Sequence, residues 1–327
     1  MKILAVDDDP IILELLTQFV SALEGHTVVT AESAMEALER LKDPAVGEFD
    51  CFLLDIQMPK MDGITLAGRI RETVRYADTP ILMLTAMSDK RYIDAAFAAG
   101  ATDYVTKPFD PLELKARINL VDGLVKARQA RTRKIFATKT LSPQVTPLEK
   151  GVELHEPISI FDVENVIDFT AMENYVQQLS RGSLFGSTCF AFSIREVGQF
   201  HGSLSSFEFY SLISDVAEVI SDALSDHQYL MAYAGNGTFV CVTESGWRPE
   251  MTRLMDGINL SLARTELFDN NGASLKPRVS AGEAVRLIWK SGQSILDALG
   301  HAHASAEKAC KDFENAQNDF WYLGRSA

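Results

Sequence analysis

Five polar residues in the first 107 positions adjoin short apolar runs, and their types suit phosphate chemistry. Asp7 and Asp8 follow the first run, Asp55 ends another, and Thr85 and Lys107 follow later ones. Three carboxylates in one crevice would repel one another unless a cation or a proton intervened. Mg²⁺ prefers such oxygen ligands, and a lysine and a threonine can bind the oxygens of a phosphoryl group. The residue types therefore predict a phosphoryl-transfer site, provided that the fold brings the five together.

Alternating strands and helices over residues 1–122 would bring them together. The predicted strands cover residues 3–6, 27–31, 49–55, 80–84 and 103–106, and the predicted helices cover residues 10–22, 34–41, 63–73, 90–99 and a last one from about 110. Strands that alternate with helices in this way form a parallel sheet covered on both faces. In a doubly wound sheet the carboxyl ends of the strands converge on one crevice. We therefore expect a five-stranded, doubly wound α/β domain with Asp55 at its carboxyl edge.

Five motifs stand in order along this region. They are Val6-Asp7-Asp8, Leu54-Asp55-Ile56-Gln57-Met58-Pro59, Met61-Asp62-Gly63, Leu84-Thr85-Ala86 and Tyr104-Val105-Thr106-Lys107-Pro108-Phe109. In these motifs the chain resembles the flavodoxin-like receiver domain of bacterial two-component response regulators. The resemblance implies that Asp55 accepts a phosphoryl group from a histidine kinase or phosphotransfer protein. It also implies that Asp7, Asp8, Asp55 and the backbone carbonyl of Gln57 hold Mg²⁺.

The same resemblance implies a switch. Thr85 and Lys107 would bind the phosphoryl oxygens, Tyr104 would turn inward as Thr85 moves, and the bond before Pro108 would be cis. The face made by the helix after Ser88, the strand at 103–106 and the helix from 110 would then change shape, which would alter either the pairing of two receivers in a homodimer or the docking of the second domain.

Each residue alone has a simpler explanation. Asp7 or Asp8 alone is most often a helix cap, Lys107 alone is most often solvated, and Tyr104 alone is most simply strand core. Their joint placement at the carboxyl ends of strands in one sheet favours the phosphorylation site. Asp9 and Asp62 are predicted turn and cap residues.

Composition limits the class of protein. The 327 residues, 46% hydrophobic and 23% charged, are typical of a globular protein of two domains. A net charge of -14 argues against a nucleic-acid partner, and no segment resembles a signal peptide or a membrane span, so we expect a cytoplasmic location. The four cysteines lie far apart in the sequence, mostly in apolar runs, which predicts buried free thiols.

A connector is expected over residues 123–164. The last receiver helix is predicted to continue past residue 122, because its apolar positions repeat as far as Val125. Basic residues without acids follow from Lys126 to Lys139, which fits a solvated helix end or a surface that docks on acidic groups. Residues 138–157 contain three prolines and read as an irregular tether.

Residues 165–327 predict an α+β domain with helices on one face of a largely antiparallel sheet. The expected helices cover residues 163–179, 207–224, 251–265 and 294–311, and the expected strands cover residues 187–194, 229–233, 238–243, 276–282 and a last one near Trp321. The order of elements, the hairpin sequence Gly235-Asn236-Gly237-Thr238-Phe239, the strand Val279 to Ala284 and the helix Ala304 to Lys308 resemble the GGDEF fold of diguanylate cyclases.

Departures from the family weigh against catalysis. The resemblance places Ser193 and Thr238 where cyclases carry metal-binding acids, and His201-Gly202-Ser203-Leu204 where they bind guanine and ribose. Mg²⁺ between triphosphates needs carboxylates, so the domain is expected to be degenerate and the chain is expected to catalyse only its own phosphorylation. We therefore expect a phosphorylation-activated response regulator whose output domain binds an unknown downstream protein. Nucleotide sensing and an active cyclase that uses other ligands remain alternatives.

Overall fold

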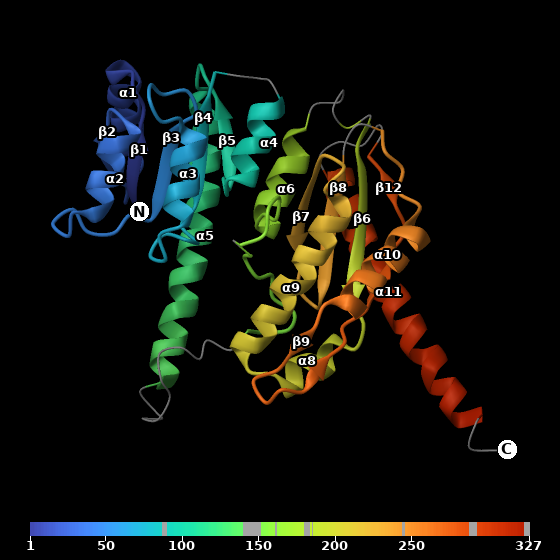
Figure 1. Cartoon of the computed structure of the whole chain (residues 1–327). Helices are drawn as coiled ribbons and strands as arrows, with labels where there is room; N and C mark the ends of the chain where they lie inside the picture. The colour runs from blue at the N-terminus through green and yellow to red at the C-terminus, as the bar shows by residue number, and fades with distance from the viewer. Residues whose placement is uncertain are drawn as a thin grey trace. The chain divides into compact units, whose positions relative to one another are not determined.

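The computed structural model describes residues 1–86, 90–139, 152–160, 162–179, 184, 186–243, 246–287 and 293–323. The chain divides into two compact units, Met1–Val145 and Thr146–Ala327, each with its own sheet and hydrophobic core (Figure 1). Within the described residues, no helix is long and apolar enough to cross a membrane.

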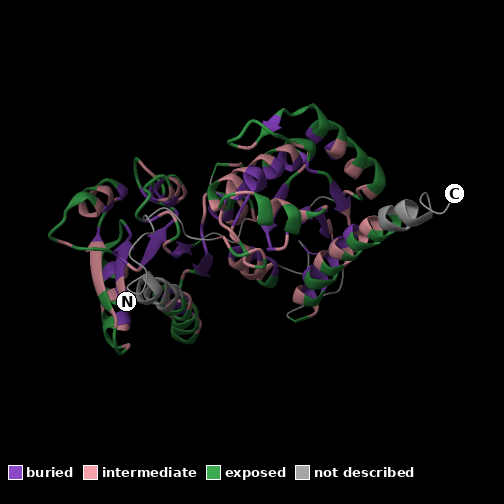
Figure 2. Ribbon diagram, turned by 90° about the horizontal axis from the view of Figure 1, so that it is seen from below, coloured by how far each residue is buried: buried purple, intermediate pink, exposed green. Residues whose placement is uncertain are grey.

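The first unit is a five-stranded parallel sheet in the order β2-β1-β3-β4-β5. Its strands are β1 (Lys2–Val6), β2 (Thr27–Ala31), β3 (Cys51–Asp55), β4 (Ile81–Thr85) and β5 (Asp103–Thr106), and its helices are α1 (Pro10–Ser21), α2 (Ala34–Lys42), α3 (Gly63–Arg71), α4 (Lys90–Ala98) and α5 (Pro111–Lys139). All residues of β3 and β4 are buried (Figure 2), because a parallel sheet is covered by helices on both faces. The predicted five-stranded α/β fold is confirmed.

Two aspartates begin helices. Asp9 accepts a hydrogen bond from the backbone N–H of Ile11 at the start of α1, and Asp62 accepts one from Thr65 at the start of α3. Both residues are therefore caps, as predicted.

Helix α5 is longer than its sheet requires. Its 29 residues span about 43 Å at the usual helical rise. Leu114, Ile118, Val121 and Val125 are buried in the core of the first unit, at the spacing of one helix face. The helix continues through Gly123 to Lys139, so the predicted extension past residue 122 is present.

The second unit begins before residue 165, within the segment that was expected to be a linker over residues 123–164. Val152, Leu154 and Ile158 pack against its core, and Ile160 is buried within it. The sequence did not reveal this packing, because three prolines interrupt the segment and remove any helical or strand periodicity from its apolar residues. The tether residues 140–151 lie outside the described part of the chain.

The second unit contains a five-stranded antiparallel sheet in the order β11-β6-β8-β7, with β12 also paired to β6. Its elements are α6 (Phe169–Gln178), β6 (Thr188–Ile194), α8 (Val197–Ser203), α9 (Ser206–Leu224), β7 (Tyr229–Tyr233), β8 (Thr238–Thr243), α10 (Met251–Arg264), β9 (Leu267–Phe268), β10 (Ser274–Leu275), β11 (Val279–Ala281), β12 (Val285–Arg286) and α11 (Gln293–Leu323). Strands β7 and β8 form the predicted hairpin, with Gly235 and Gly237 at positive φ in its turn.

Three expectations for this unit were wrong. Helices cover both faces of the sheet, since α9 and α10 pack against the face that contains Phe190 and Phe192 while α11 packs on β6, β8 and β11 from the other. Residue 321 lies in helix α11 and not in a strand, because a short aromatic run does not distinguish the two. Helix α6 begins at Phe169, six residues after the predicted start at Val163.

The four cysteines are free and buried, as predicted. Burial raises the pKa of the Cys51 and Cys189 thiols to about 12, raises that of Cys241 well above its usual value, and raises that of Cys310 to about 11. Each thiol therefore stays protonated at neutral pH.

Candidate functional site

Three carboxylates converge at the carboxyl edge of the first sheet. Asp7 and Asp8 follow β1, and Asp55 ends the neighbouring strand β3. One oxygen from each lies within 4.8 Å of the other two. Asp7 is fully buried, Asp55 is 4% exposed, and Asp8 is exposed. The sheet thus brings together the three predicted metal-binding aspartates, with one of them open to solvent.

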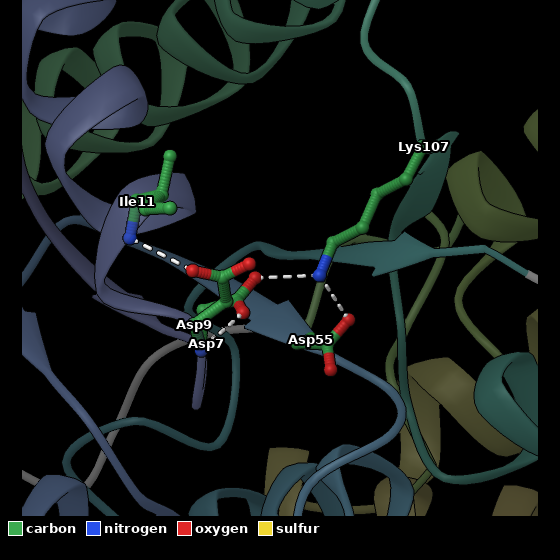
Figure 3. Close-up of polar contacts among 5 residues, drawn as sticks. All are labelled: Asp7, Asp9, Ile11, Asp55 and Lys107. Atoms are coloured by element: carbon green, nitrogen blue, oxygen red, sulfur yellow. Dashed lines mark hydrogen bonds and ion pairs between the residues drawn. The ribbon is translucent and has the colours of Figure 1, made fainter.

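Lys107 bridges two of these carboxylates. Its Nζ donates to Asp7 Oδ2 and to Asp55 Oδ1, each at 2.6 Å (Figure 3). The backbone N–H of Asp9 donates to the other oxygen of Asp7, so both oxygens of this buried carboxylate have partners. The bond between Lys107 and Pro108 is cis, as predicted.

The charges of the cluster are not balanced. Burial raises the pKa of Asp55; the hydrogen bond and charge of Lys107 oppose this shift, and the carboxylates of Asp7 and Asp8 add to it. Burial alone would lower the pKa of Lys107, but its hydrogen bonds and charge contacts with Asp55 and Asp7 outweigh burial and raise it. Three carboxylates therefore share one ammonium group, an arrangement that favours a further cation.

Thr85 and Lys107 are linked through the backbone. Thr85 ends β4 and is fully buried, and its carbonyl oxygen accepts a hydrogen bond from the N–H of Lys107 at 2.7 Å. A displacement at the end of β4 would therefore also move the backbone that follows β5.

Tyr104 is buried in this structure. It is 9% exposed, and its ring lies edge-to-face against Phe97 of α4, with the ring centroids 6.3 Å apart. The side chain of Gln57, one residue beyond Ile56, is exposed, and only its backbone carbonyl was proposed as a ligand. Residues 87–89, which include Ser88 just before the helix of the predicted face, lie outside the described residues.

Gly63 positions Asp55, a contact that residue spacing did not reveal. A Cβ added at Gly63 would lie 2.0 Å from the backbone oxygen of Asp55, and the Gly63 N–H donates to the carbonyl of Ile56. Only glycine permits α3 to approach the end of β3 so closely. The motif Met61-Asp62-Gly63 was the available signal, although its glycine suggested no contact.

Comparison with known proteins agrees with this geometry. Residues 3–119 match the model of the response regulator receiver domain. The probable C4-dicarboxylate response regulator DctR of Halalkalibacterium halodurans is 30% identical over 166 residues, which are 47% of this chain and 69% of DctR. The chain belongs to the response regulator family. Receiver domains of this family interact with histidine kinases or phosphotransfer proteins, and residues 3–119 are the part of this response regulator that matches such a domain.

Other relatives share the same region. The transcriptional regulatory protein KdpE of Staphylococcus aureus is 35% identical over 141 residues, which cover 43% of this response regulator and 58% of KdpE. Chemotaxis protein CheY4 of Vibrio cholerae has a solved structure that is 34% identical, with a TM-score of 0.34; the match covers 37% of this chain and 97% of that one. The chain spans about half the length of the first curated relatives that it matches.

In the second unit, the two residues that stand where cyclases carry metal-binding acids lie next to each other. Ser193 at the end of β6 and Thr238 at the start of β8 are buried neighbours, and the Thr238 hydroxyl donates to the Ser193 hydroxyl at 3.1 Å. Two neutral hydroxyls that satisfy each other offer no charge to a divalent cation.

A cavity of about 540 Å³ opens beside this pair. Its polar lining includes Asn236 of the hairpin turn and Glu196, Glu307, Lys311 and Glu314. The sequence singled out the segment Ala304 to Lys308 of α11 for its resemblance, but it did not predict that positions 307, 311 and 314, which follow helical spacing and share one face, line a cavity. The charged groups of the lining are mostly carboxylates.

Proposed function

We propose that this response regulator is a phosphorylation-controlled switch whose phosphoacceptor is Asp55. The observation that carries the proposal is the bridge from Lys107 to Asp7 and Asp55, at 2.6 Å on each side, beside the exposed carboxylate of Asp8. This places a nucleophilic carboxylate, a fixed cation and an excess of acidic oxygens at one edge of the sheet.

The acidic cluster fits Mg²⁺. Its donors are hard oxygens, its net charge is negative, and Asp8 is open to solvent. Asp7, Asp8, Asp55 and the backbone carbonyl of Gln57 would hold the ion. Bound there, it would reduce the repulsion between the phosphoryl oxygens and the carboxylates.

The protein's own groups would carry the rest of the reaction. The Asp55 carboxylate oxygen bonds to phosphorus as the phosphorus–nitrogen bond of the donor phosphohistidine breaks, and the released imidazole takes a proton from solvent. Lys107 then exchanges its contact with Asp55 for one with a phosphoryl oxygen, and the Thr85 hydroxyl binds another. Because the N–H of Lys107 donates to the carbonyl oxygen of Thr85, a shift of either residue toward the phosphoryl group would move the backbone of both.

Replacement of the acceptor tests this assignment. Asp55→Asn should abolish uptake of a phosphoryl group from acetyl phosphate with Mg²⁺, because the amide oxygen is a poor nucleophile. Intact mass spectrometry measures the uptake. Asp9→Asn is the matched control, since asparagine also caps helices and α1 should remain intact. Mg²⁺-dependent uptake by Asp55→Asn would refute the assignment.

For the second unit we propose a degenerate GGDEF-like domain that binds a downstream protein and is not a cyclase. The order strand, helix, hairpin, helix, strand supports the fold. The hydroxyl pair of Ser193 and Thr238 offers no negative charge to the metal ions of a metal–triphosphate complex, which opposes catalysis at these two positions.

The alternative is that this unit still binds or converts a guanine nucleotide, which the cavity volume of about 540 Å³ would permit. Incubation with GTP and Mg²⁺ or Mn²⁺ should yield no cyclic di-GMP, and thermal-shift titration with GTP should leave the unfolding temperature unchanged. Product formation would establish a cyclase, and a shift without product would establish a sensor. A pull-down with the beryllofluoride-treated chain, compared with the untreated chain, would identify the downstream partner.

A further inference from the structure

The cavity of about 540 Å³ in the second unit lies between the end of β6, the turn of the hairpin and α11. Its volume is in the range of cavities that hold small molecules. Its charged lining residues are Glu196, Glu307, Glu314 and Lys311, which are three carboxylates against one ammonium group, a net charge of -2. Such a lining favours a ligand with a net positive charge.

Two of these carboxylates are held in place through one oxygen each. Asn236 Nδ2 donates to Glu307 Oε1 at 3.1 Å, and the backbone N–H of Glu196 donates to Glu314 Oε1 at 2.8 Å. The other oxygen of each carboxylate, Oε2, has no partner among the described residues. Glu307 and Glu314 are therefore preorganised, and each keeps an oxygen for a ligand.

The spacing of Glu307 and Glu314 suits an extended ligand. They are two turns apart on α11, so their backbone positions are separated by roughly 10 Å along the helix axis. Among the described residues, the only three acidic, histidine or cysteine side chains close enough to share one metal ion are Asp7, Asp8 and Asp55. The glutamates of the cavity therefore favour a ligand with two separate cationic groups over a single ion.

The cavity also offers two donors. The Thr238 hydroxyl donates to Ser193 Oγ, which leaves the hydrogen of the Ser193 hydroxyl without an acceptor in the described part of the chain. Ser193 is only 2% exposed and lines the cavity, as does Lys311, whose Nζ has no ion-pair partner among the described residues. A buried donor without an acceptor is costly, so these two groups favour a ligand that also carries an anionic oxygen.

We propose that this cavity binds a free amino acid with a cationic side chain, such as L-arginine or L-lysine. The cationic side chain and the α-ammonium group pair with Glu307 and Glu314, and the α-carboxylate accepts from Ser193 and Lys311. The two cationic groups and one carboxylate of the ligand thus match the groups that the cavity leaves open. The site belongs to the second unit alone and requires neither phosphorylation of Asp55 nor a downstream protein, so it gives the output domain a signal of its own.

Calorimetric titration of the full chain tests the class of ligand. L-Arginine and L-lysine should each show saturable binding to one site. Agmatine, which is arginine without its carboxylate, should bind at least about tenfold more weakly, as for the loss of a charged hydrogen bond. L-Glutamate, with the opposite pattern of charge, should not bind. N-acetyl-L-arginine amide keeps only the guanidinium group and stands for a side chain of a protein partner; equal binding of this compound or of agmatine would overturn the proposal of a free amino acid.

Variants of α11 test the place of binding. Glu307→Gln and Glu314→Gln should each weaken L-arginine at least about tenfold, because each loses its charge while its amide oxygen can still accept the existing hydrogen bond. Lys311→Met should weaken L-arginine but not agmatine, which has no carboxylate to lose. Asp312→Asn is the control, since Asp312 is an exposed acid of the same helix that does not line the cavity.

Thermal unfolding of each variant shows that the second unit remains folded. Absence of saturable binding of both amino acids to the wild-type chain would overturn the proposal. Unchanged affinity in Glu307→Gln and Glu314→Gln would overturn it as well, because the amino acid would then bind elsewhere. Either result leaves the proposed function of Asp55 intact, since none of these titrations involves the receiver.

Discussion

Lys107 bridges two carboxylates of the acidic cluster, and Asp8 remains exposed beside them. This division of roles explains how three acids can share one strand edge. The buried pair shares the ammonium group of Lys107, whereas Asp8 is open to an ion that arrives from solvent. The cluster is therefore stable enough to fold and still favours a divalent cation.

This division predicts how Mg²⁺ affects stability. Binding to the folded receiver should raise its free energy of unfolding by about 1.4 kcal/mol at ten times the dissociation constant. Asp8→Asn should abolish the Mg²⁺-dependent rise and slightly stabilise the chain without Mg²⁺, because it removes one repulsive charge. Thermal unfolding with and without Mg²⁺ measures both effects. Asp9→Asn should behave like the wild type; loss of the Mg²⁺ effect in Asp9→Asn alone would place the ion elsewhere.

Much of the cluster could be predicted from the sequence, because strand ends follow directly from the apolar runs. Asp55 and Lys107 were expected at one crevice for that reason, and the sheet brings them together. The burial of Asp7 and the exposure of Asp8 could not be predicted, since the strand ends at Val6, before both residues, and the backbone then turns toward α1. The contact of Gly63 with Asp55 was also missed, because a missing side chain leaves no pattern.

At the scale of elements, the approach of α3 to β3 predicts a sharp difference between two glycines of one helix. Gly63→Ala should destabilise the receiver by about 1–3 kcal/mol and slow phosphoryl uptake, because the new Cβ would displace the end of β3. Gly68→Ala is the matched control in the same helix, with nothing within 4 Å, and should be neutral or stabilising by up to about 1 kcal/mol. Chemical denaturation and intact mass measure the two effects. Equal behaviour of the variants would show that the close approach does not matter.

The hairpin of the second unit predicts a loss of stability at alkaline pH. Burial raises the pKa of Tyr233 to about 12, while the Gly237 N–H that donates to its hydroxyl oxygen opposes the shift. An unfolded tyrosine ionises near pH 10, so the stability contribution is complete below about pH 10 and is lost as pH rises through about 12, by up to about 2.7 kcal/mol.

Replacement of this tyrosine separates two effects. Tyr233→Phe should remove this alkaline dependence and, at neutral pH, lower the free energy of unfolding by about 1–3 kcal/mol, because Gly237 N–H loses its acceptor. Denaturation of the second unit at about pH 8 and about pH 11 measures both effects. Identical pH dependence of wild type and Tyr233→Phe would contradict the assignment.

The elements were predictable where periodicity was strong. The residues of β2 and β5 were predicted to the residue, and the hairpin followed from its glycine-rich turn. The strands β9, β10 and β12 are two residues long, too short to create a pattern. Such strands depend on partners distant in the sequence, as β12 depends on β6.

At the scale of the whole molecule, a receiver that switches needs a surface that responds. Arg117 of α5 pairs with the buried carboxylate of Asp103 in β5 at 2.9 Å, so these two elements are joined on one side of the sheet. Leu120, one turn after Arg117, is 54% exposed. This side belongs to the face that we predict to pair two receivers.

The pairing can be tested with one charge. Beryllofluoride should raise the sedimentation coefficient of the wild-type chain toward that of a dimer. Leu120→Asp should weaken dimer affinity at least tenfold and so prevent this rise in the sedimentation coefficient. The reason is that pairing would bury a carboxylate without a partner. Val74→Asp is the control, since Val74 is 93% exposed and follows α3, which is not one of the three elements of the face. An unshifted wild type would contradict pairing, and a shift retained by Leu120→Asp would contradict this face.

The buried cysteines allow the opening of each unit to be measured through the reactivity of its own thiols. Cys51 lies in the first unit, and Cys189, Cys241 and Cys310 lie in the second. Because burial keeps these thiols protonated and covered, an alkylating reagent can react only when the surrounding unit opens. The rate at which each thiol is alkylated would therefore report the rate of local opening of each unit separately, within one intact chain and without an added label.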